Sequence, residues 1–340
     1  MNVSDCQSDS QIITYSPAYT LVPTYECFNR CSYCNFRAEP GSSPWLSLED
    51  AENQLRLLQS QGVCEILILS GEVHPRSSRR KAWFQRIYDL CDLALSLGFL
   101  PHTNVGPLSW EEMARLKQVN VSMGLMLEQL TPELLKTVHC YAPSKIPEVR
   151  LQQLQWAGEL GIPFTTGLLF GIGETEQDWW ESLNAIAQIH GEYGHIQEVI
   201  LQPYSEGTTE IFHSQSFGIN QLPKVIRKAR QILPLDITIQ IPPNLVDTVG
   251  ELPQRSSALL ACLEAGARDL GGISPKDEVN PDYPHPHSYR LRDVIEPAGW
   301  TLVPRLPVYP KYDSWLPARL QRVVERWRIK EIANPHQRRH

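Results

Sequence analysis

Short apolar runs alternate with amphipathic stretches along most of this sequence. The run from Cys64 to Leu69 is apolar at all but one position, which is typical of a strand buried on both faces. The stretch before it begins at Ser47 and carries Glu49 and Asp50, acidic residues that favour a helix N-terminus. The same pattern recurs and predicts strands at 19–23, 64–69, 99–103, 121–127, 164–170, 196–201, 237–241 and 267–270, and helices at 47–62, 81–97, 110–117, 147–161, 179–190, 222–233, 256–265 and 318–331.

This strict alternation predicts parallel strands joined by right-handed crossovers. Eight strand–helix units fit an α/β fold of the (β/α)8 TIM-barrel type, and a partial six-stranded barrel is the alternative. A barrel of this kind can span most of the 340 residues as one domain. We expect a flexible leader at 1–15, the barrel at 16–300 and a C-terminal extension at 301–340 that packs on the barrel.

Composition narrows the class of protein. The chain is 42% hydrophobic and 20% charged, which is ordinary for a soluble globular protein. Its net charge of −7 argues against a nucleic-acid partner, which needs a basic surface. The sequence has no run of 18 apolar residues and no signal-like start, so we expect neither a membrane span nor secretion. Three of its eight cysteines, at 64, 91 and 262, lie in apolar segments, which suits a reducing cytoplasm.

Three further cysteines form the most informative motif. Cys27, Cys31 and Cys34 are spaced Cys-x-x-x-Cys-x-x-Cys on a segment that follows the first predicted strand. Three thiolates on one loop can hold three irons of a 4Fe–4S cube and leave the fourth iron open, unlike the four-cysteine ferredoxin patterns. A zinc site is the alternative, although zinc prefers four ligands in separated pairs. Accidental clustering of structural cysteines is the other possibility.

With an aromatic residue, Tyr33, before its third cysteine, this motif resembles that of the radical S-adenosylmethionine (SAM) superfamily. The resemblance implies a 4Fe–4S cluster whose open iron binds SAM, and a low-potential electron donor. It also implies SAM contacts from residues at the carboxyl ends of strands, where a barrel places its active site. These residues are Gly71, Glu72, Glu128, Arg150 and Gly171. The alternative reading is that Glu72 and Glu128 are solvated or capping residues and that Arg150 is exposed on a helix.

Five longer stretches are distinctive: 101–104, 122–128, 162–167, 191–199 and 269–275. Together they resemble the narrower CofG family, the first subunit of 7,8-didemethyl-8-hydroxy-5-deazariboflavin (FO) synthase. The resemblance runs from about residue 14 to about residue 304. Two departures concern loop shape only: Val73 and His74 stand where we expect a Lys-Pro-like pair, and Val105 stands where we expect a proline.

The family resemblance implies a carbon–nitrogen lyase that forms a deazaflavin. A CofH-type second subunit would join tyrosine-derived carbon to 5-amino-6-(D-ribitylamino)uracil, and this chain would close the ring by radical hydrogen abstraction with loss of ammonia. Two alternatives remain: another radical SAM enzyme of a biotin, thiamine or menaquinone pathway, or an iron–sulfur electron carrier without SAM chemistry. The candidate substrate-binding residues are polar and lie at or near strand ends: His102, Thr103, Asn104, Gln202, Tyr204, Asn244 and Asp269.

Overall fold

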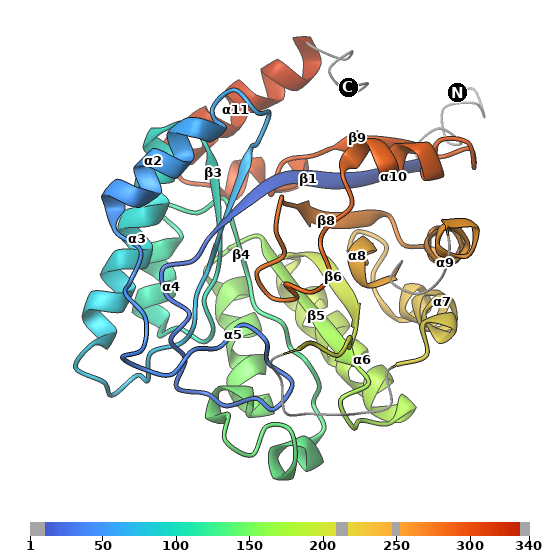
Figure 1. Cartoon of the computed structure of the whole chain (residues 1–340), viewed down its shortest axis with the longest axis horizontal. Helices are drawn as coiled ribbons and strands as arrows, with labels where there is room; N and C mark the ends of the chain where they lie inside the picture. The colour runs from blue at the N-terminus through green and yellow to red at the C-terminus, as the bar shows by residue number, and fades with distance from the viewer. Residues whose placement is uncertain (1–10, 209–216, 247–251, 334–340) are drawn as a thin grey trace.

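In the computed structural model, the chain folds into a closed barrel of eight parallel strands (Figure 1). The structure describes residues 11–208, 217–246 and 252–333. The eight-stranded prediction is therefore confirmed, and the six-stranded alternative is wrong. The strands are β1 (Ile12–Leu21), β2 (Glu65–Leu69), β3 (Leu100–Asn104), β4 (Ser122–Gly124), β5 (Phe164–Phe170), β6 (Ile196–Pro203), β7 (Thr238–Gln240) and β8 (Asp269–Ile273).

Strand β1 closes the barrel and is longer than the sequence predicts. It begins at Ile12 instead of Tyr19, so its first residues lie inside the expected leader. Its first half pairs with a ninth strand, β9 (Thr301–Pro304), and its second half, from Ala18 to Leu21, pairs with β2 (Figure 1). The opposite edge of β1 pairs with β8. Residues 1–10 of the expected leader lie outside the described residues.

The helices begin and end where local signals place them. Ser47 caps α2 by accepting a hydrogen bond from the backbone N–H of Asp50, and Ser109 and Thr175 form capping boxes at α4 and α6. Helix α6 ends at Gly194, whose φ of 67° favours glycine. The helices are α2 (Leu48–Leu58), α3 (Arg80–Ser96), α4 (Trp110–Leu116), α5 (Pro147–Glu159), α6 (Glu176–Tyr193), α7 (Leu222–Ile232), α8 (Pro243–Val246), α9 (Leu252–Ala265), α10 (Ser288–Ile295) and α11 (Ala318–Ala333).

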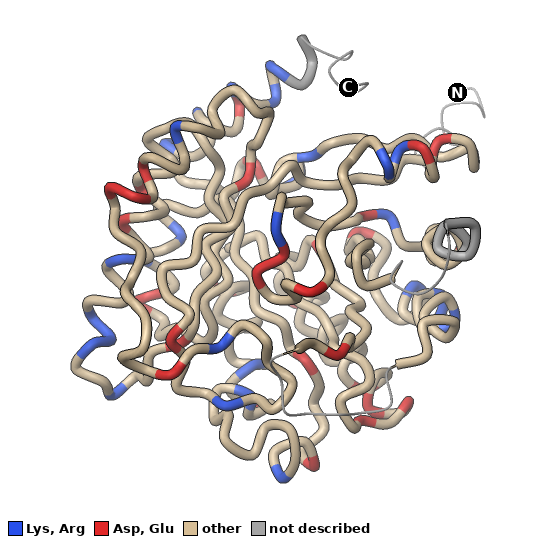
Figure 2. The backbone as a smooth tube through the Cα atoms, in the orientation of Figure 1, with Lys and Arg blue, Asp and Glu red and all other residues tan. Residues whose placement is uncertain are grey.

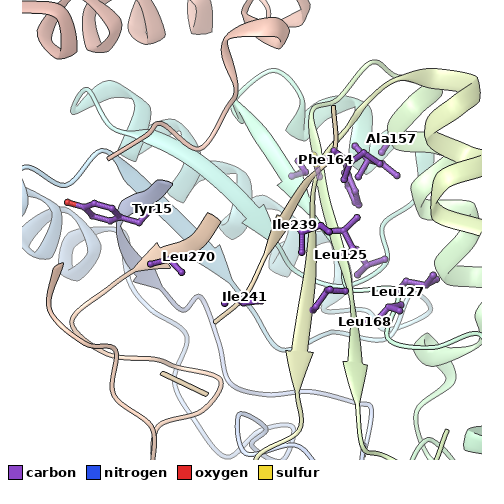
Figure 3. Packing of buried hydrophobic residues seen from close by; sticks show 14 of the residues in the cluster. Tyr15, Leu125, Leu127, Ala157, Phe164, Leu168, Ile239, Ile241 and Leu270 are labelled. Carbon is purple, nitrogen blue, oxygen red and sulfur yellow. The ribbon is translucent and has the colours of Figure 1, made fainter. Parts of the chain in front are cut away.

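The main core fills the layer between the strands and the helices around them. Phe164 and Leu168 of β5 belong to it, as do Ala157 of α5 and Leu270 of β8 (Figure 3). Every residue of β5 is buried, as expected for a strand covered on both faces. Lys and Arg alternate with Asp and Glu over the outer helices (Figure 2). Within the described residues, none of the helices is long and apolar enough to cross a membrane.

The C-terminal segment covers the amino-terminal end of the barrel. Leu306, Val308 and Tyr312 pack in a second core with Cys64 and Leu100, which stand at the starts of β2 and β3. Helix α11 continues this contact: the indole of Trp327 donates a hydrogen bond to the carbonyl of Gly98, 2.8 Å away. The cysteine loop follows β1 at the other end, so the barrel interior has a floor built by the tail and a mouth built by loops.

Candidate active site

A cavity of about 380 Å³ lies inside the barrel. Its walls come from nearly every strand, so it runs from the cysteine loop down to the C-terminal tail. Two layers of polar side chains line it. The upper layer contains Cys31, Cys34, Glu72, Glu128, Lys145 and Arg150, and the lower layer contains Glu65, His102, Glu198, Gln240 and Arg305.

The cysteine loop is held from both sides by backbone hydrogen bonds. The N–H of Phe28 donates to the carbonyl of Glu72 at 3.0 Å, and the N–H of Arg30 donates to the carbonyl of Tyr141 at 2.9 Å. Within the loop, the N–H of Cys34 donates to the carbonyl of Cys31 at 3.2 Å. The loop is therefore fixed between the end of β2 and the segment after β4, and two of its thiols line the cavity.

The three cysteines are each partly exposed and share one environment. Burial raises the pKa of Cys27 to about 11 and that of Cys31 to about 12, and it also raises the pKa of Cys34. The negative charge of Cys34 would add to both of the larger shifts, which places the three sulfurs within electrostatic reach of one another. Because thiols rather than exposed carboxylates form this cluster, its donor chemistry suits iron–sulfur ligation.

The arrangement fits an iron–sulfur cube better than a single metal ion. Within the described residues, no three His, Cys, Asp or Glu side chains converge as ligands of one ion would. In a 4Fe–4S cube each thiolate binds its own iron, so three sulfurs need not meet at one point. A zinc ion would instead need about four ligands at one centre.

Gly71 and Glu72 lie directly beside the cysteine loop. The N–H of Gly71 donates to the carbonyl of Thr24 at 2.8 Å, and a Cβ at this position would stand only 2.3 Å from the carbonyl oxygen of Glu26. Only glycine therefore allows β2 to end this close to the loop. The carboxylate of Glu72 lines the cavity and packs over Gly106, where a Cβ would stand 2.3 Å from its Cδ.

Glu128 is held in a strained backbone conformation beside two cations. Its φ is 65°, a value that residues other than glycine adopt at a cost. Burial raises the pKa of its carboxyl, but Lys145, which forms an ion pair with it, and Arg150 outweigh burial and hold the pKa below its usual value. Arg150 is buried and donates to the carbonyls of Ser144, at 2.7 Å, and Met126, at 3.0 Å. The alternative reading of Arg150 as an exposed helix arginine is therefore wrong.

The structure brings most of the candidate residues together, but not all of them. His102, Asn104, Gln202 and Tyr204 line the cavity with Cys31, Cys34, Glu72, Glu128 and Arg150. Five other candidates, Cys27, Gly71, Gly171, Asn244 and Asp269, do not line it. Thr103 also faces elsewhere: its hydroxyl donates to the side chain of Asn120.

Three of these five have clear contacts of their own. The N–H of Gly171 donates to the carboxylate of Glu174 at 2.6 Å. The amide of Asn244 donates to Asp277 at 2.8 Å and so braces the loop after β8. Asp269 is fully buried, and the guanidinium of Arg305 binds it through two hydrogen bonds of 2.6 and 2.8 Å.

Sequence reasoning missed Lys145 in the upper layer and Glu65, Glu198 and Arg305 in the lower one. Lys145 ends a short 3-10 turn, 17 positions after its partner Glu128, a spacing that no local rule links. Arg305 lies in the C-terminal extension, which was expected to pack on the barrel and carried no candidate site residue. A carboxylate inside a predicted strand, as at Glu65 and Glu198, was the available signal, because buried charges occur mainly where they are paired.

Comparison with known proteins identifies the family. A model of the radical SAM superfamily matches residues 21–186. The 7,8-didemethyl-8-hydroxy-5-deazariboflavin synthase of Trichormus variabilis is 68% identical over 323 residues, which cover 95% of this chain and 93% of that protein. The enzyme of the same name from a Nostoc species is 67% identical over 317 residues, covering 93% of this chain and 91% of that protein.

The fold is also shared with solved structures. The FeFe-hydrogenase maturase HydG from Carboxydothermus hydrogenoformans superposes with a TM-score of 0.69, covering 86% of this chain and 68% of that one, at 20% identity. This likeness concerns the barrel alone, whereas the identities of 67% and 68% extend over nearly the whole length of both partners. Both resemblances drawn from the sequence motifs are thus confirmed, and the chain belongs to the 7,8-didemethyl-8-hydroxy-5-deazariboflavin synthase family of the radical SAM superfamily.

Proposed function

We propose that this chain closes the deazaflavin ring of 7,8-didemethyl-8-hydroxy-5-deazariboflavin. Its substrate would be the tyrosine-derived adduct of 5-amino-6-(D-ribitylamino)uracil, and ammonia would leave as the ring closes. The observation that carries the proposal is one continuous cavity with partly exposed thiols at its mouth and polar groups on its floor. When bound, the 4Fe–4S cluster and SAM supply a 5′-deoxyadenosyl radical that abstracts hydrogen.

In this proposal, the thiolates of Cys27, Cys31 and Cys34 hold the cluster. Burial keeps these thiols protonated in the free protein, because it raises the pKa of each one. Iron binding therefore displaces protons as the cluster assembles. The backbone hydrogen bonds on both sides of the loop fix its path before the metal arrives, which reduces the entropy lost on binding.

The upper layer supplies groups of the right charge for SAM. Glu72 would accept hydrogen bonds from the SAM amino group, and Gly71 keeps it against the cysteine loop. Arg150 would face the SAM carboxylate, and Lys145 adds a second cation to the same wall. Glu128, kept ionised by both cations, would face the ribose or sulfonium side. Gly171 would let backbone approach the adenine, although it does not line the cavity.

The substrate would occupy the space below SAM. His102, Asn104, Gln202 and Tyr204 offer hydrogen-bonding groups to the pyrimidinedione and the ribityl hydroxyls. Asn244 and Asp269 would act indirectly, through other residues. Asn244 donates a hydrogen bond to the loop over the cavity, and Asp269 holds Arg305 in the cavity floor. A polar substrate suits these walls, because each polar group left without a partner on binding would cost free energy.

A complete pathway would need two partners. A CofH-type second subunit would supply the adduct, and a low-potential donor would reduce the cluster. The biotin-, thiamine- and menaquinone-pathway alternatives keep the upper layer but would need a different substrate. A simple electron carrier would need neither the buried Arg150 nor the ion pair of Glu128 with Lys145.

The test uses the anaerobically reconstituted, reduced protein. With SAM and the purified adduct, it should produce 5′-deoxyadenosine and a fluorescent deazaflavin. Deoxyadenosine without deazaflavin, when the adduct is intact, would favour another radical SAM substrate. If neither product forms while the cluster is fully assembled and reduced, the electron-carrier hypothesis replaces the enzyme.

A further inference from the structure

The cavity floor contains a buried cluster of charged groups that the proposed chemistry leaves unassigned. Glu65 of β2, Glu198 of β6 and Arg305 of the tail line the floor, and Asp269 of β8 lies behind them. Arg305 binds Asp269 through both prongs of its guanidinium and also forms an ion pair with Glu198. The three carboxyl groups are each at most 7% exposed.

Charge balance requires a proton in this cluster. Among the described residues, the ionisable groups that face Glu198 are Arg305, Asp269, Glu65 and the phenol of Tyr309. One guanidinium cannot neutralise three carboxylates, and burying the excess negative charge is costly. Asp269 takes the two-pronged interaction with Arg305, so the proton falls to Glu198 or Glu65, since burial raises the pKa of both carboxyls.

Glu198 is suited to hold that proton. Arg305 occupies its Oε1, and the hydroxyl of Thr165 lies 3.0 Å from its Oε2. A hydroxyl can donate or accept, so Thr165 accommodates a neutral carboxyl as well as a charged one. The pKa of Glu198 is raised to about 7, chiefly by burial. Arg305 opposes this increase, whereas the negative charges of Asp269 and Glu65 add to it.

His102 faces the same space in one defined tautomer. The hydroxyl of Ser122 donates to the carbonyl of Pro307 at 2.7 Å, so its oxygen accepts from Nδ1–H of His102, also at 2.7 Å. Burial, with a smaller effect of Arg305, lowers the pKa of His102 to about 3, so the ring is neutral and its Nε2 carries a lone pair. In the described part of the chain, Nε2 has no hydrogen-bond partner.

His102 of β3 and Glu198 of β6 line the same cavity, separated by β4 and β5, and both lie within electrostatic reach of Arg305. Gly124 of β4 pairs with Thr165 of β5, which pairs with Glu198 of β6. Nε2 of His102 lies over Gly124, where a Cβ would stand only 2.9 Å away. The absence of a side chain at Gly124 therefore leaves room beside Nε2, over the strand that separates β3 from β5 and β6.

We propose that Nε2 of His102 and the neutral carboxyl of Glu198 form an acceptor–donor pair at the cavity floor. The pair recognises the adjacent N–H and C=O groups of a pyrimidinedione ring, an inference that rests on the proposed function. His102 accepts from the ring N–H, and Glu198 donates to the neighbouring carbonyl oxygen. The tail is a positioning element in this arrangement: Pro307 sets the tautomer of His102 through Ser122, and Arg305 orients Glu198.

The test measures binding of the purified adduct to the cluster-containing, SAM-loaded protein without a reductant, so that no turnover occurs. Calorimetric titrations at several pH values compare the wild-type protein with Glu198→Gln and His102→Phe. The affinity of the wild-type protein should fall about 30-fold between pH 6 and pH 8.5, because the neutral fraction of a carboxyl with a pKa of about 7 falls by that factor. Glu181→Gln, on the exposed face of α6, is the matched control and should follow the wild-type curve.

Glu198→Gln keeps a neutral donor that does not titrate, so its affinity should stay near the wild-type value at pH 6 across the whole range. Titration of the adduct itself affects both proteins alike and cancels in the comparison. His102→Phe should bind about tenfold more weakly at every pH, the loss of about one buried hydrogen bond. An unchanged pH profile in Glu198→Gln, or wild-type affinity in His102→Phe, would overturn the pair. If the wild-type protein fails to bind the adduct at any pH, the proposed function itself is refuted.

Discussion

Replacing Arg305 with methionine should show how strongly the tail stabilises the barrel. The substitution keeps most of the side-chain volume but removes the only guanidinium that faces Asp269 and Glu198 within the described residues. Removing one partner of a buried ion pair costs about 3–5 kcal/mol, because the remaining charge stays buried without compensation. Asp269 is fully buried and Glu198 nearly so, which places this site in that class.

The lost free energy of unfolding predicts a decrease in the melting temperature. An unfolding entropy of about 2.1 cal/mol/K per residue gives about 0.7 kcal/mol/K for a chain of 340 residues. The variant should therefore melt about 4–7 °C below the wild-type protein at pH 8, as followed by circular dichroism on cluster-containing protein. Arg305→Lys keeps the positive charge but loses the two-pronged geometry. Its melting temperature should therefore lie between those of the wild-type protein and Arg305→Met.

The effect should also depend on pH in a defined direction. Without Arg305, the folded-state pKa values of the floor carboxyls rise further above their unfolded values. A group whose folded pKa is raised favours folding at low pH and loses that contribution as pH rises through the folded pKa. The gap between variant and wild type should thus be small near pH 5 and grow as the pH rises.

Arg319→Met is the control from the same tail. Arg319 forms an ion pair of 2.6 Å with Asp92, but both side chains are about half exposed, at 49% and 45%. Such surface pairs contribute at most about 1 kcal/mol, so this variant should melt within about 1.5 °C of the wild-type protein. Equal melting temperatures for the two variants, or a gap for Arg305→Met that does not grow with pH, would refute the reasoning about a buried, charge-paired floor.

Two further predictions concern the mouth of the barrel. Cys31→Ala should lose the brown iron–sulfur absorbance on reconstitution, whereas Cys140→Ala, at an exposed thiol, should keep it; retained absorbance in the first variant excludes Cys31 as a ligand. Gly71→Ala should cost about 1–3 kcal/mol in stability and lower iron loading, because its Cβ would press on the carbonyl of Glu26. Gly191→Ala, at an open helical position, should be neutral or stabilising by up to about 1 kcal/mol, and the two should be compared by thermal melting and iron content.

The fold was predictable wherever a local pattern was complete. Strand β5 has the bounds, 164–170, that the sequence pattern predicts. Helix α2 begins directly after Ser47, the residue from which the sequence predicts its start. The first half of β1 and all of β9 were not predicted. They pair with each other across 289 positions, and α10, the helix that precedes β9, was not predicted from the sequence either. Strand β9 is also only four residues long and ends in Pro304, which weakens any local strand signal.

The residues of the candidate site likewise include some that a local motif predicts and others that only the tertiary structure brings together. The cysteine triad and Gly71-Glu72 are contiguous motifs, so their residue types and spacing indicate their chemistry directly. Arg305 has no such motif, because its importance comes from the convergence of β2, β6 and β8 on one point inside the barrel. Asp269 was predicted to bind substrate, but the sequence could not reveal that Arg305 would already occupy both of its oxygens.

The upper layer and the floor of the cavity differ in how much of each lies within the region shared across the superfamily. The superfamily model matches residues 21–186, which include the cysteine loop, Glu72, Glu128 and Arg150 but end before Glu198, Asp269 and Arg305. The upper layer can therefore serve many reactions, whereas the floor depends on strands and a tail outside the matched region. Since the floor is the part farthest from the cysteine loop, substrate choice can change there without moving a proposed cluster ligand. It follows that substitutions in the tail of this chain should alter adduct binding before they alter cleavage of SAM.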